Sequence, residues 1–148
     1  MALALSMADA VDSLMNLWSA AAQAASLPLS PHQLRALRIL EGRPGLNLTA
    51  LAVGMDIGMP AASRLCDRLE AAGLLERELH PGNRRAVRLR LTRQGRQALD
   101  EVAWHRSRRL AAVLGAMEPA EREALEQGLE GFLAARDGMT APEDGTGS

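Results

Sequence analysis

The sequence has one cysteine, no lysine and no tyrosine, and its other aromatic residues are two tryptophans and one phenylalanine. A lone cysteine, Cys66, excludes an internal disulfide framework and a multi-cysteine metal site. Because aromatic side chains are scarce, a core must be built from Leu, Ala, Val and Met, and Leu and Ala favour helix. The composition predicts a mainly helical fold with no cofactor and no metal.

Long apolar runs are also missing. No stretch approaches the roughly 18 consecutive apolar residues that span a bilayer. The Ala- and Leu-rich segment 1–26 lacks a basic start and is interrupted by Asp9, Asp12 and Asn16, which indicates an amphipathic helix and not a signal peptide. A length of 148 residues suits one compact fold. We expect a cytoplasmic protein with no membrane partner.

The net charge of −1 gives no general attraction to nucleic acid, but the charges are segregated along the chain. Residues 60–110 contain twelve arginines against six acidic residues, whereas residues 111–148 contain two against eight. Arginine presents a permanently charged fork that suits phosphates and the edge of guanine. The middle of the chain is therefore the candidate for contact with an anionic partner.

Apolar residues recur every three or four positions in four segments before residue 73, a spacing that predicts helices. The expected helices cover 3–25, 31–42, 48–55 and 59–72. Ser30 and Gln33 form a capping-box pattern at the start of the second. Gly73 supplies the left-handed residue that ends the fourth.

The apolar period then changes from near 3.6 to 2, which predicts two strands at 75–79 and 86–91 joined by turn-forming residues. Thr92 is placed to cap a helix that runs to about 114, and a last helix follows from about 119. From Asp137 the composition becomes rich in Gly, Pro, Thr and Ser, so we expect a disordered tail over 137–148.

Two helices joined by a tight turn, with a hairpin soon after the second, make a winged helix-turn-helix. Ala52, Asp56 and Ala62 have the matching offsets: a small residue where the helices approach, a turn residue, and a core residue of the second helix. Asp replaces the usual Gly at the turn, but it tolerates a left-handed conformation.

Longer strings make the assignment more specific. These are SRLCDRLE at 63–70, LLER at 74–77, NRRAV at 83–87 and LTRQGR at 91–96. Together they closely resemble the multiple-antibiotic-resistance regulator (MarR) family of winged helix-turn-helix transcriptional regulators. The resemblance extends from about residue 29 to residue 96, and the flanking helices fit it in order and length.

The resemblance implies a mainly α fold with a small β-hairpin wing and with N- and C-terminal dimerisation helices. It divides the chain into a dimerisation helix (1–28), a DNA-binding lobe (29–96, with the recognition helix at 59–72 and the wing at 75–91), further dimerisation helices (97–136) and the tail. It also implies a homodimer that binds a pseudo-palindromic operator in double-stranded DNA. Many members of the family are released by a small aromatic or phenolic effector.

The expected DNA-contacting residues lie on the recognition helix, all but one of them on its first turns, and on the wing. They are Met59, Pro60, Ala61, Ser63, Arg64, Arg68, Arg84, Arg85 and Arg88. Arg64 is the candidate for reading a base, because its fork matches the two acceptors of guanine. The alternative for Arg64 is an arginine solvated or paired with Glu, and for the wing it is a solvated charged hairpin. Asn83 stands where the family usually has an acidic residue that braces the wing.

The resemblance places the expected effector pocket near Trp18, His32 and Trp104, with core packing as the alternative for the tryptophans and a structural or solvated role for the histidine. Cys66 falls on the buried face of its helix, where a thiol is usually inert, although some family members sense oxidants through cysteine.

These observations together predict a sequence-specific DNA-binding transcriptional regulator, a repressor that an effector releases. The rival hypothesis is a dimeric winged-helix module that binds protein and not DNA. An enzyme is the third class, but the sequence offers no nucleophile–base pairing, phosphate loop or metal cluster to support it.

Overall fold

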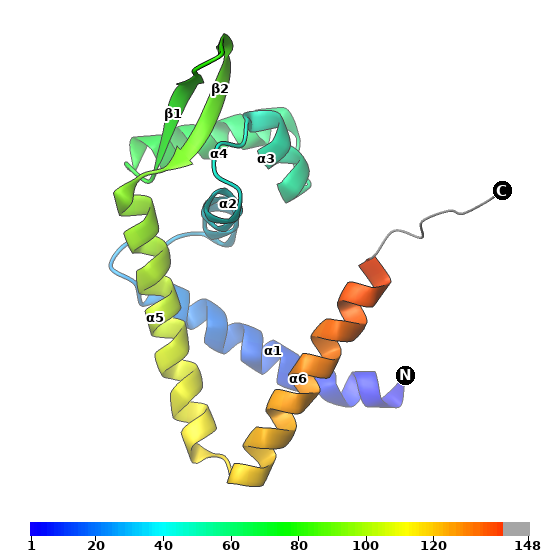
Figure 1. The fold of residues 1–148 in the computed structure, drawn as a ribbon. Coiled ribbons are helices and arrows are strands. Elements are labelled where there is room, and N and C mark those ends of the chain that lie inside the picture. The colour runs from blue at the N-terminus through cyan, green and yellow to red at the C-terminus, as the bar shows by residue number, and fades with distance from the viewer. Residues whose placement is uncertain (141–148) are drawn as a thin grey trace, which may run out of the picture. The chain divides into compact units, whose positions relative to one another are not determined.

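The computed structural model describes residues 1–140, apart from the side chains of His80, Arg84, Arg85 and Thr140. Within these residues the fold is mainly helical with one antiparallel hairpin, as predicted (Figure 1). In chain order the elements are α1 (Ala2–Gln23), α2 (Pro31–Gly42), α3 (Leu48–Met55), α4 (Met59–Ala71), β1 (Leu75–His80), β2 (Asn83–Leu91), α5 (Arg93–Ala116) and α6 (Pro119–Thr140).

The chain divides into two compact units, residues 1–109 and 110–148. The helix α5 begins in the first unit and ends in the second, which also contains α6. The predicted disordered tail is wrong for residues 137–140, because α6 continues through them. Residues 141–148 of that predicted tail lie outside the described residues. No helix in residues 1–140 is long and apolar enough to cross a membrane.

Side-chain caps fix where α2 and α3 begin. At α2 the hydroxyl of Ser30 accepts from the Gln33 amide, and the Gln33 side chain accepts from the Ser30 amide, which confirms the predicted capping box. Asn47 caps α3 by accepting from the Ala50 amide over 2.8 Å. Caps of this kind each contribute about 1 kcal/mol.

The turn between α3 and α4 is set by Asp56, the only non-glycine residue of the described chain with a positive φ, at 54°. Its amide donates to the carbonyl of Val53, and the next amide, of Ile57, donates to Ala52. Asp therefore takes the left-handed conformation that the helix-turn-helix requires at this position, as predicted from the sequence.

The core lies where α2, α3, α4 and the hairpin meet the first turns of α5. Its largest fully buried side chains are Leu37, Leu40, Leu51, Leu69, Leu75, Leu89, Val102 and Cys66. Each buried aliphatic side chain contributes roughly 1.5–3 kcal/mol, so this cluster fixes how the hairpin sits against α4. No aromatic residue belongs to it.

A tight junction joins the hairpin to α5. The hydroxyl of Thr92 accepts from the Gly95 amide and donates to the carbonyl of Gly73, so one side chain caps α5 and holds the end of α4. Gly95 is required here because a Cβ atom would come far closer to the Leu74 carbonyl oxygen than the 3.0 Å that real Cβ atoms respect.

The hairpin is longer than the sequence indicated: β1 reaches His80 and β2 begins at Asn83 rather than at residue 86. Cross-strand pairing continues through residues that the sequence predicted to form the turn, with an irregularity between Leu79 and His80. Leu89 and Leu91 are buried as predicted, whereas Val87, on the same face nearer the tip, is 39% exposed. It lies opposite Leu79, beyond the edge of the core.

Candidate nucleic-acid interface

The helix α4 buries one face in the core and exposes the other to solvent. Its buried face is Ala62, Leu65, Cys66 and Leu69. Arg64 and Arg68 lie one turn apart and are exposed, and none of the ion pairs among the described residues involves either of them. Both guanidinium groups are therefore available to a partner.

The other residues predicted for this helix surround the two arginines. Met59 is 43% exposed and Pro60 is exposed at the first turn, while Ala61 and Ser63 are half-buried. The small side chains of Ala61 and Ser63 leave room for a partner to approach the start of α4 closely. The structure thus places all six predicted α4 residues on or beside the exposed face of one helix, five of them in its first two turns and Arg68 in its last turn.

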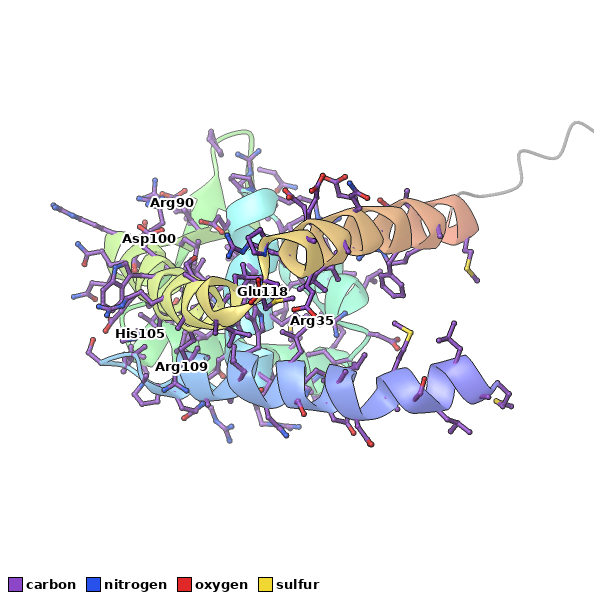
Figure 2. All side chains as sticks on the ribbon, turned by 90° about the horizontal axis from the view of Figure 1, so that it is seen from below. Arg35, Arg90, Asp100, His105, Arg109 and Glu118 are labelled. Carbon is purple, nitrogen blue, oxygen red and sulfur yellow. The ribbon has the colours of Figure 1, made fainter. Side chains whose placement is uncertain are left out.

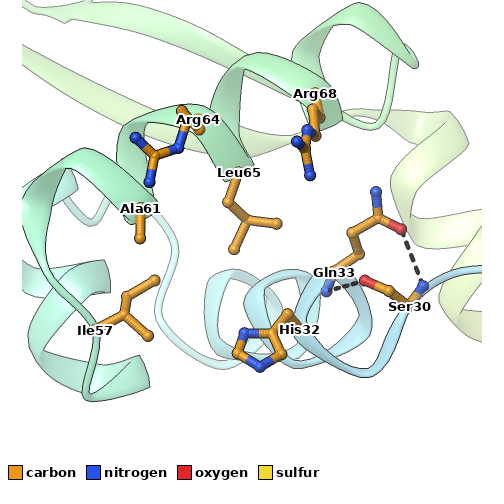
Figure 3. A pocket seen from close by; sticks show the side chains of 8 residues that line it. All are labelled: Ser30, His32, Gln33, Ile57, Ala61, Arg64, Leu65 and Arg68. Atoms are coloured by element: carbon orange, nitrogen blue, oxygen red, sulfur yellow. Dashed lines mark hydrogen bonds between the residues drawn. The ribbon is translucent and has the colours of Figure 1, made fainter.

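A cavity of about 390 Å³ opens beside these arginines (Figure 3). The start of α2 provides one side of it and α4 the other. Its lining residues are Ser30, His32, Gln33, Ile57, Ala61, Arg64, Leu65 and Arg68. His32, which the sequence predicts in one pocket with the tryptophans, lies here next to α4.

An ion-pair bridge joins the hairpin to α4. Arg77 on β1 contacts Asp67 over 2.9 Å and Glu70 over 3.2 Å, both on α4. These acidic partners raise the pKa of Arg77 further above its ordinary value. This bridge, which residue spacing in the sequence does not reveal, fixes the hairpin relative to the face of α4 that carries Arg64.

A second brace runs across the hairpin itself. Arg90 on β2, labelled in Figure 2, pairs with Glu76 and Glu78 on β1. The strand register places these three residues on the hairpin face opposite the core. The guanidinium of Arg90 is therefore engaged within the hairpin.

Of the predicted wing contacts, the side chain of Arg88 is described and those of Arg84 and Arg85 lie outside the described residues. Arg88 is half-buried, and its side chain passes over Gly45 in the loop before α3. The Leu89 amide donates to the Leu46 carbonyl over 2.7 Å, so this loop also supports β2.

The three predicted effector residues are not brought together. The ring of Trp18, on α1, lies 4.7 Å from the guanidinium of Arg106. Trp104 is 53% exposed on α5, where it contacts His105 edge-on and Arg108 by its face. His32 lines the separate cavity described above.

Cys66 is fully buried on α4, and burial raises the pKa of its thiol. A buried, protonated thiol is a poor nucleophile, which supports the structural interpretation of this residue. In residues 1–140 no group of three or more His, Cys, Asp or Glu residues could hold a metal ion.

Comparison with known families and structures gives a consistent result. The model of the MarR family matches residues 27–86, which run from the middle of the α1–α2 connection into β2. RV1404 from Mycobacterium tuberculosis is 30% identical, with a TM-score of 0.83 over 90% of this chain and 92% of that one. The chain belongs to the MarR family.

Two further relatives of this MarR-family chain are informative. A Thauera aromatica protein assigned to transcriptional regulation of the hcr operon is 36% identical over 66 residues, which is 45% of this chain and 40% of that protein. The match therefore spans less than half the length of that curated relative. The transcriptional repressor CouR, solved bound to a 23-mer DNA duplex, is 26% identical, with a TM-score of 0.63 over 88% of this chain and 92% of that one.

One residue of this MarR-family chain stands out that sequence analysis had left unassigned. Arg106 occupies a position in the apolar stripe of α5, four residues after Val102, and is 7% exposed. A charged residue at a stripe position was the signal that could have identified it.

Proposed function

We propose that this protein is a cytoplasmic homodimer that binds a pseudo-palindromic operator in double-stranded DNA and represses transcription. The observation that carries the proposal is the exposed pair Arg64 and Arg68 on α4, beside a hairpin that is braced and rich in arginine. In a winged helix-turn-helix this helix enters the major groove and its first turns reach base edges.

The chemistry of the surface suits DNA in two ways. An arginine fork donates to both acceptors of guanine, and a good contact of this kind discriminates by about 1–3 kcal/mol. Arginines on the wing neutralise phosphates and enter narrow minor grooves. The DNA-bound relative CouR, with a similar fold and 26% identity, supports the assignment.

Exposed apolar stripes on α1 and α6 support the homodimer. On α1 the exposed large apolar residues are Leu3, Leu5, Met7, Val11, Leu14 and Met15, and on α6 they are Leu125, Leu129, Phe132, Leu133 and Met139. Stripes of this length on a monomer indicate an interface. A two-fold dimer presents two copies of α4 to two half-sites.

The function further includes release by a small effector, the expectation that the family resemblance raised. Two cavities among the described residues are candidate sites for such an effector. One is lined by His32 beside α4, and the other is lined by Arg106 beside the α1–α2 connection. The first shares Arg64 and Arg68 with the proposed DNA surface, so a ligand there competes with DNA for the same side chains.

The test begins with selection of bound fragments from genomic DNA, followed by a scan of single base-pair changes in the selected site. Arg64→Ala is expected to remove the preference at one position in each half-site, at a cost of about 1–3 kcal/mol. Arg136→Ala, the same change on α6, is the matched control and should leave the profile unchanged.

A salt titration distinguishes the contribution of the wing to DNA binding from that of α4. Replacing Arg84 and Arg85 by Ala should weaken binding to every sequence and reduce the slope of log affinity against log salt by about one for each lost phosphate contact. If the wild type binds no selected duplex even at low salt, this proposal is wrong, and the rival hypothesis of a dimeric winged-helix module that binds protein takes its place.

A further inference from the structure

Among the described side chains of residues 29–96, four large apolar ones are exposed. Leu79 and Val87 lie opposite each other on the hairpin, and Val53 and Met59 lie on either side of the turn between α3 and α4. Val53 is 76% exposed, although valine is one of the residue types that proteins bury most often. The apolar surface at the α3–α4 turn therefore requires an explanation.

Val53 and Met59 line the same open cavity, which has a volume of about 530 Å³ and lies between α3 and the start of α4 (Figure 1). Ala52, which is buried, and Ile57, which is half-buried, also line it, so its lining is largely aliphatic. The remaining lining residues are polar or lack a side chain, and they are Thr49, Asp56 and Gly58.

The cavity is continuous with the surface that we propose to contact DNA. Met59 is the first residue of α4, and Arg64 lies on the same helix. In a helix-turn-helix the first turns of this helix reach the base edges in the major groove. A cavity that includes Met59 therefore meets DNA when α4 enters the groove.

Asp56 indicates which part of the DNA the cavity meets. Its side chain is exposed and takes part in none of the ion pairs among the described residues. An uncompensated carboxylate repels the phosphates of the DNA backbone. The partner that suits an aliphatic cavity beside this carboxylate is a base edge and not a phosphate.

We propose that the cavity binds the 5-methyl group of a thymine, with Val53 and Met59 as the residues that contact it; this inference rests on the proposed function. Thymine presents this methyl group in the major groove, and its burial removes apolar surface from water. The flexible side chain of Met59 adapts its shape to the methyl group. Val53 and Met59 therefore select thymine, in addition to the guanine contact proposed for Arg64.

The test removes one methyl group from the DNA at a time. In the selected operator, each dT is replaced in turn by dU, which keeps the base pair and its hydrogen-bonding groups but lacks the 5-methyl group. Fluorescence anisotropy with labelled duplexes measures the affinity of the full-length protein. We expect dU at one position in each half-site to weaken binding by about three- to tenfold, the value for loss of one buried methyl group.

Variants of the protein locate the contact. Val53→Ala and Met59→Ala should each lower the ratio of dT to dU affinity at that position toward one, whereas Met59→Leu keeps an aliphatic side chain and should retain the ratio. Val87→Ala is the matched control, because it makes the same change at an exposed valine of the hairpin. The hairpin is expected in the minor groove, where thymine presents no methyl group, so this variant should retain the wild-type ratio.

A second measurement adds the methyl group to a different base. The T·A pair at the sensitive position is replaced by C·G, with either cytosine or 5-methylcytosine in the strand that carried the thymine. The wild type should bind the 5-methylcytosine duplex more tightly than the cytosine duplex, because the methyl group returns to the same place in the major groove. Met59→Ala should bind the two duplexes equally.

Three outcomes would overturn the inference while the wild type still binds the operator. They are equal affinity for dT and dU at every position, no gain from 5-methylcytosine in the wild type, and a dT to dU ratio that is unchanged in both Val53→Ala and Met59→Ala. A wild type that binds no unmodified duplex rejects the proposed function itself. The affinity for the unmodified operator therefore distinguishes the two failures.

Discussion

The guanidinium of Arg77 on β1 donates to the carboxylate of Asp67 on α4 over 2.9 Å, and so ties together the two elements that we propose contact DNA. Glu70, one turn further along the helix, accepts from the same guanidinium. The wing therefore keeps its position through its own ion pairs in addition to the core beneath it.

Removing this bridge should lower operator affinity with little loss of stability. A partly exposed ion pair contributes about 0.2–1 kcal/mol, so Arg77→Gln is expected to cost about 1 kcal/mol for the two contacts. Operator affinity should fall by more, because the wing and α4 must then be ordered on binding. Thermal unfolding and a binding titration measure the two effects. Arg136→Gln removes an exposed pair with Asp137 on α6 and should change neither; equal results for the two variants would argue against the bridge.

Gly95 offers a test of the junction between the hairpin and α5. In Gly95→Ala the new Cβ meets the backbone oxygen of Leu74, which cannot move without shifting the end of α4. We expect a loss of about 3 kcal/mol or more in the free energy of unfolding. Gly115→Ala, in the same helix, meets nothing within 4 Å and should stabilise by about 0.5–1 kcal/mol. Denaturant unfolding compares the pair, and a neutral Gly95→Ala would contradict this account.

The fold was largely predictable because its determinants are local. The capping box of Ser30 and Gln33, the left-handed Asp56 and the change of apolar period at Leu75 each depend on a few neighbouring residues. The hairpin ends and the end of α6 were less predictable, because turn-forming residues such as Asn83 also pair across strands and Asp137 also continues a helix.

The site was predictable only where the helical period decides it. Spacing placed Arg64 and Arg68 on the exposed face of α4, opposite Cys66. Spacing alone gave neither the distance between α4 and β1 nor the register of β1 against β2. The partners of Arg77 on α4 and those of Arg90 on β1 could therefore not be assigned to specific acids. The predicted effector residues stood on three separate elements, and their contacts depend on packing that periodicity does not determine.

Glu101 introduces a pH dependence. Its carboxylate accepts from the amide and the hydroxyl of Ser26, each over 2.7 Å, and these hydrogen bonds, followed by the proximity of His105, lower its pKa. A lowered folded-state pKa means that the stabilisation is present above the ordinary glutamate range, near pH 4, and is lost as the pH falls through the folded value.

The expected result is a stability difference between wild type and Glu101→Gln that is present at pH 7 and disappears below about pH 4. Ser26→Ala should reproduce this profile, because it removes the hydroxyl donor to the same carboxylate. Glu118→Gln, an exposed change at the start of α6, serves as the control. Thermal unfolding measures this stability difference across pH 3–8, a range of about five units that includes the ordinary pKa of glutamate. A difference that persists unchanged to acid pH would exclude the proposed contact.

Cys66 should react slowly with a thiol reagent in the native protein. It is fully buried and its pKa is raised by desolvation, so the reactive thiolate is both inaccessible and rare at neutral pH. Ellman's reagent should modify it at the rate of transient unfolding, and at once in denaturant. Cys66→Ala should then bind DNA identically before and after treatment with peroxide, and so should the wild type. Rapid native modification with loss of DNA binding would assign a redox role.

The apolar stripe of α6 should hold the dimer together. Leu129 and Phe132 are 47% and 67% exposed and lie on one face of the helix, whereas Ala134 lies on the opposite face. Introducing charges by Leu129→Glu with Phe132→Glu should raise the dimer dissociation constant by about a hundredfold or more, because two charges would have to be buried in an apolar contact. Ala134→Glu adds a charge away from the stripe and should leave the constant unchanged. Sedimentation equilibrium measures the dissociation constants. Operator affinity should fall when the dimer is lost, because the two half-sites are then no longer contacted together. A doubly substituted protein that still sediments as a folded dimer would place the interface on another surface.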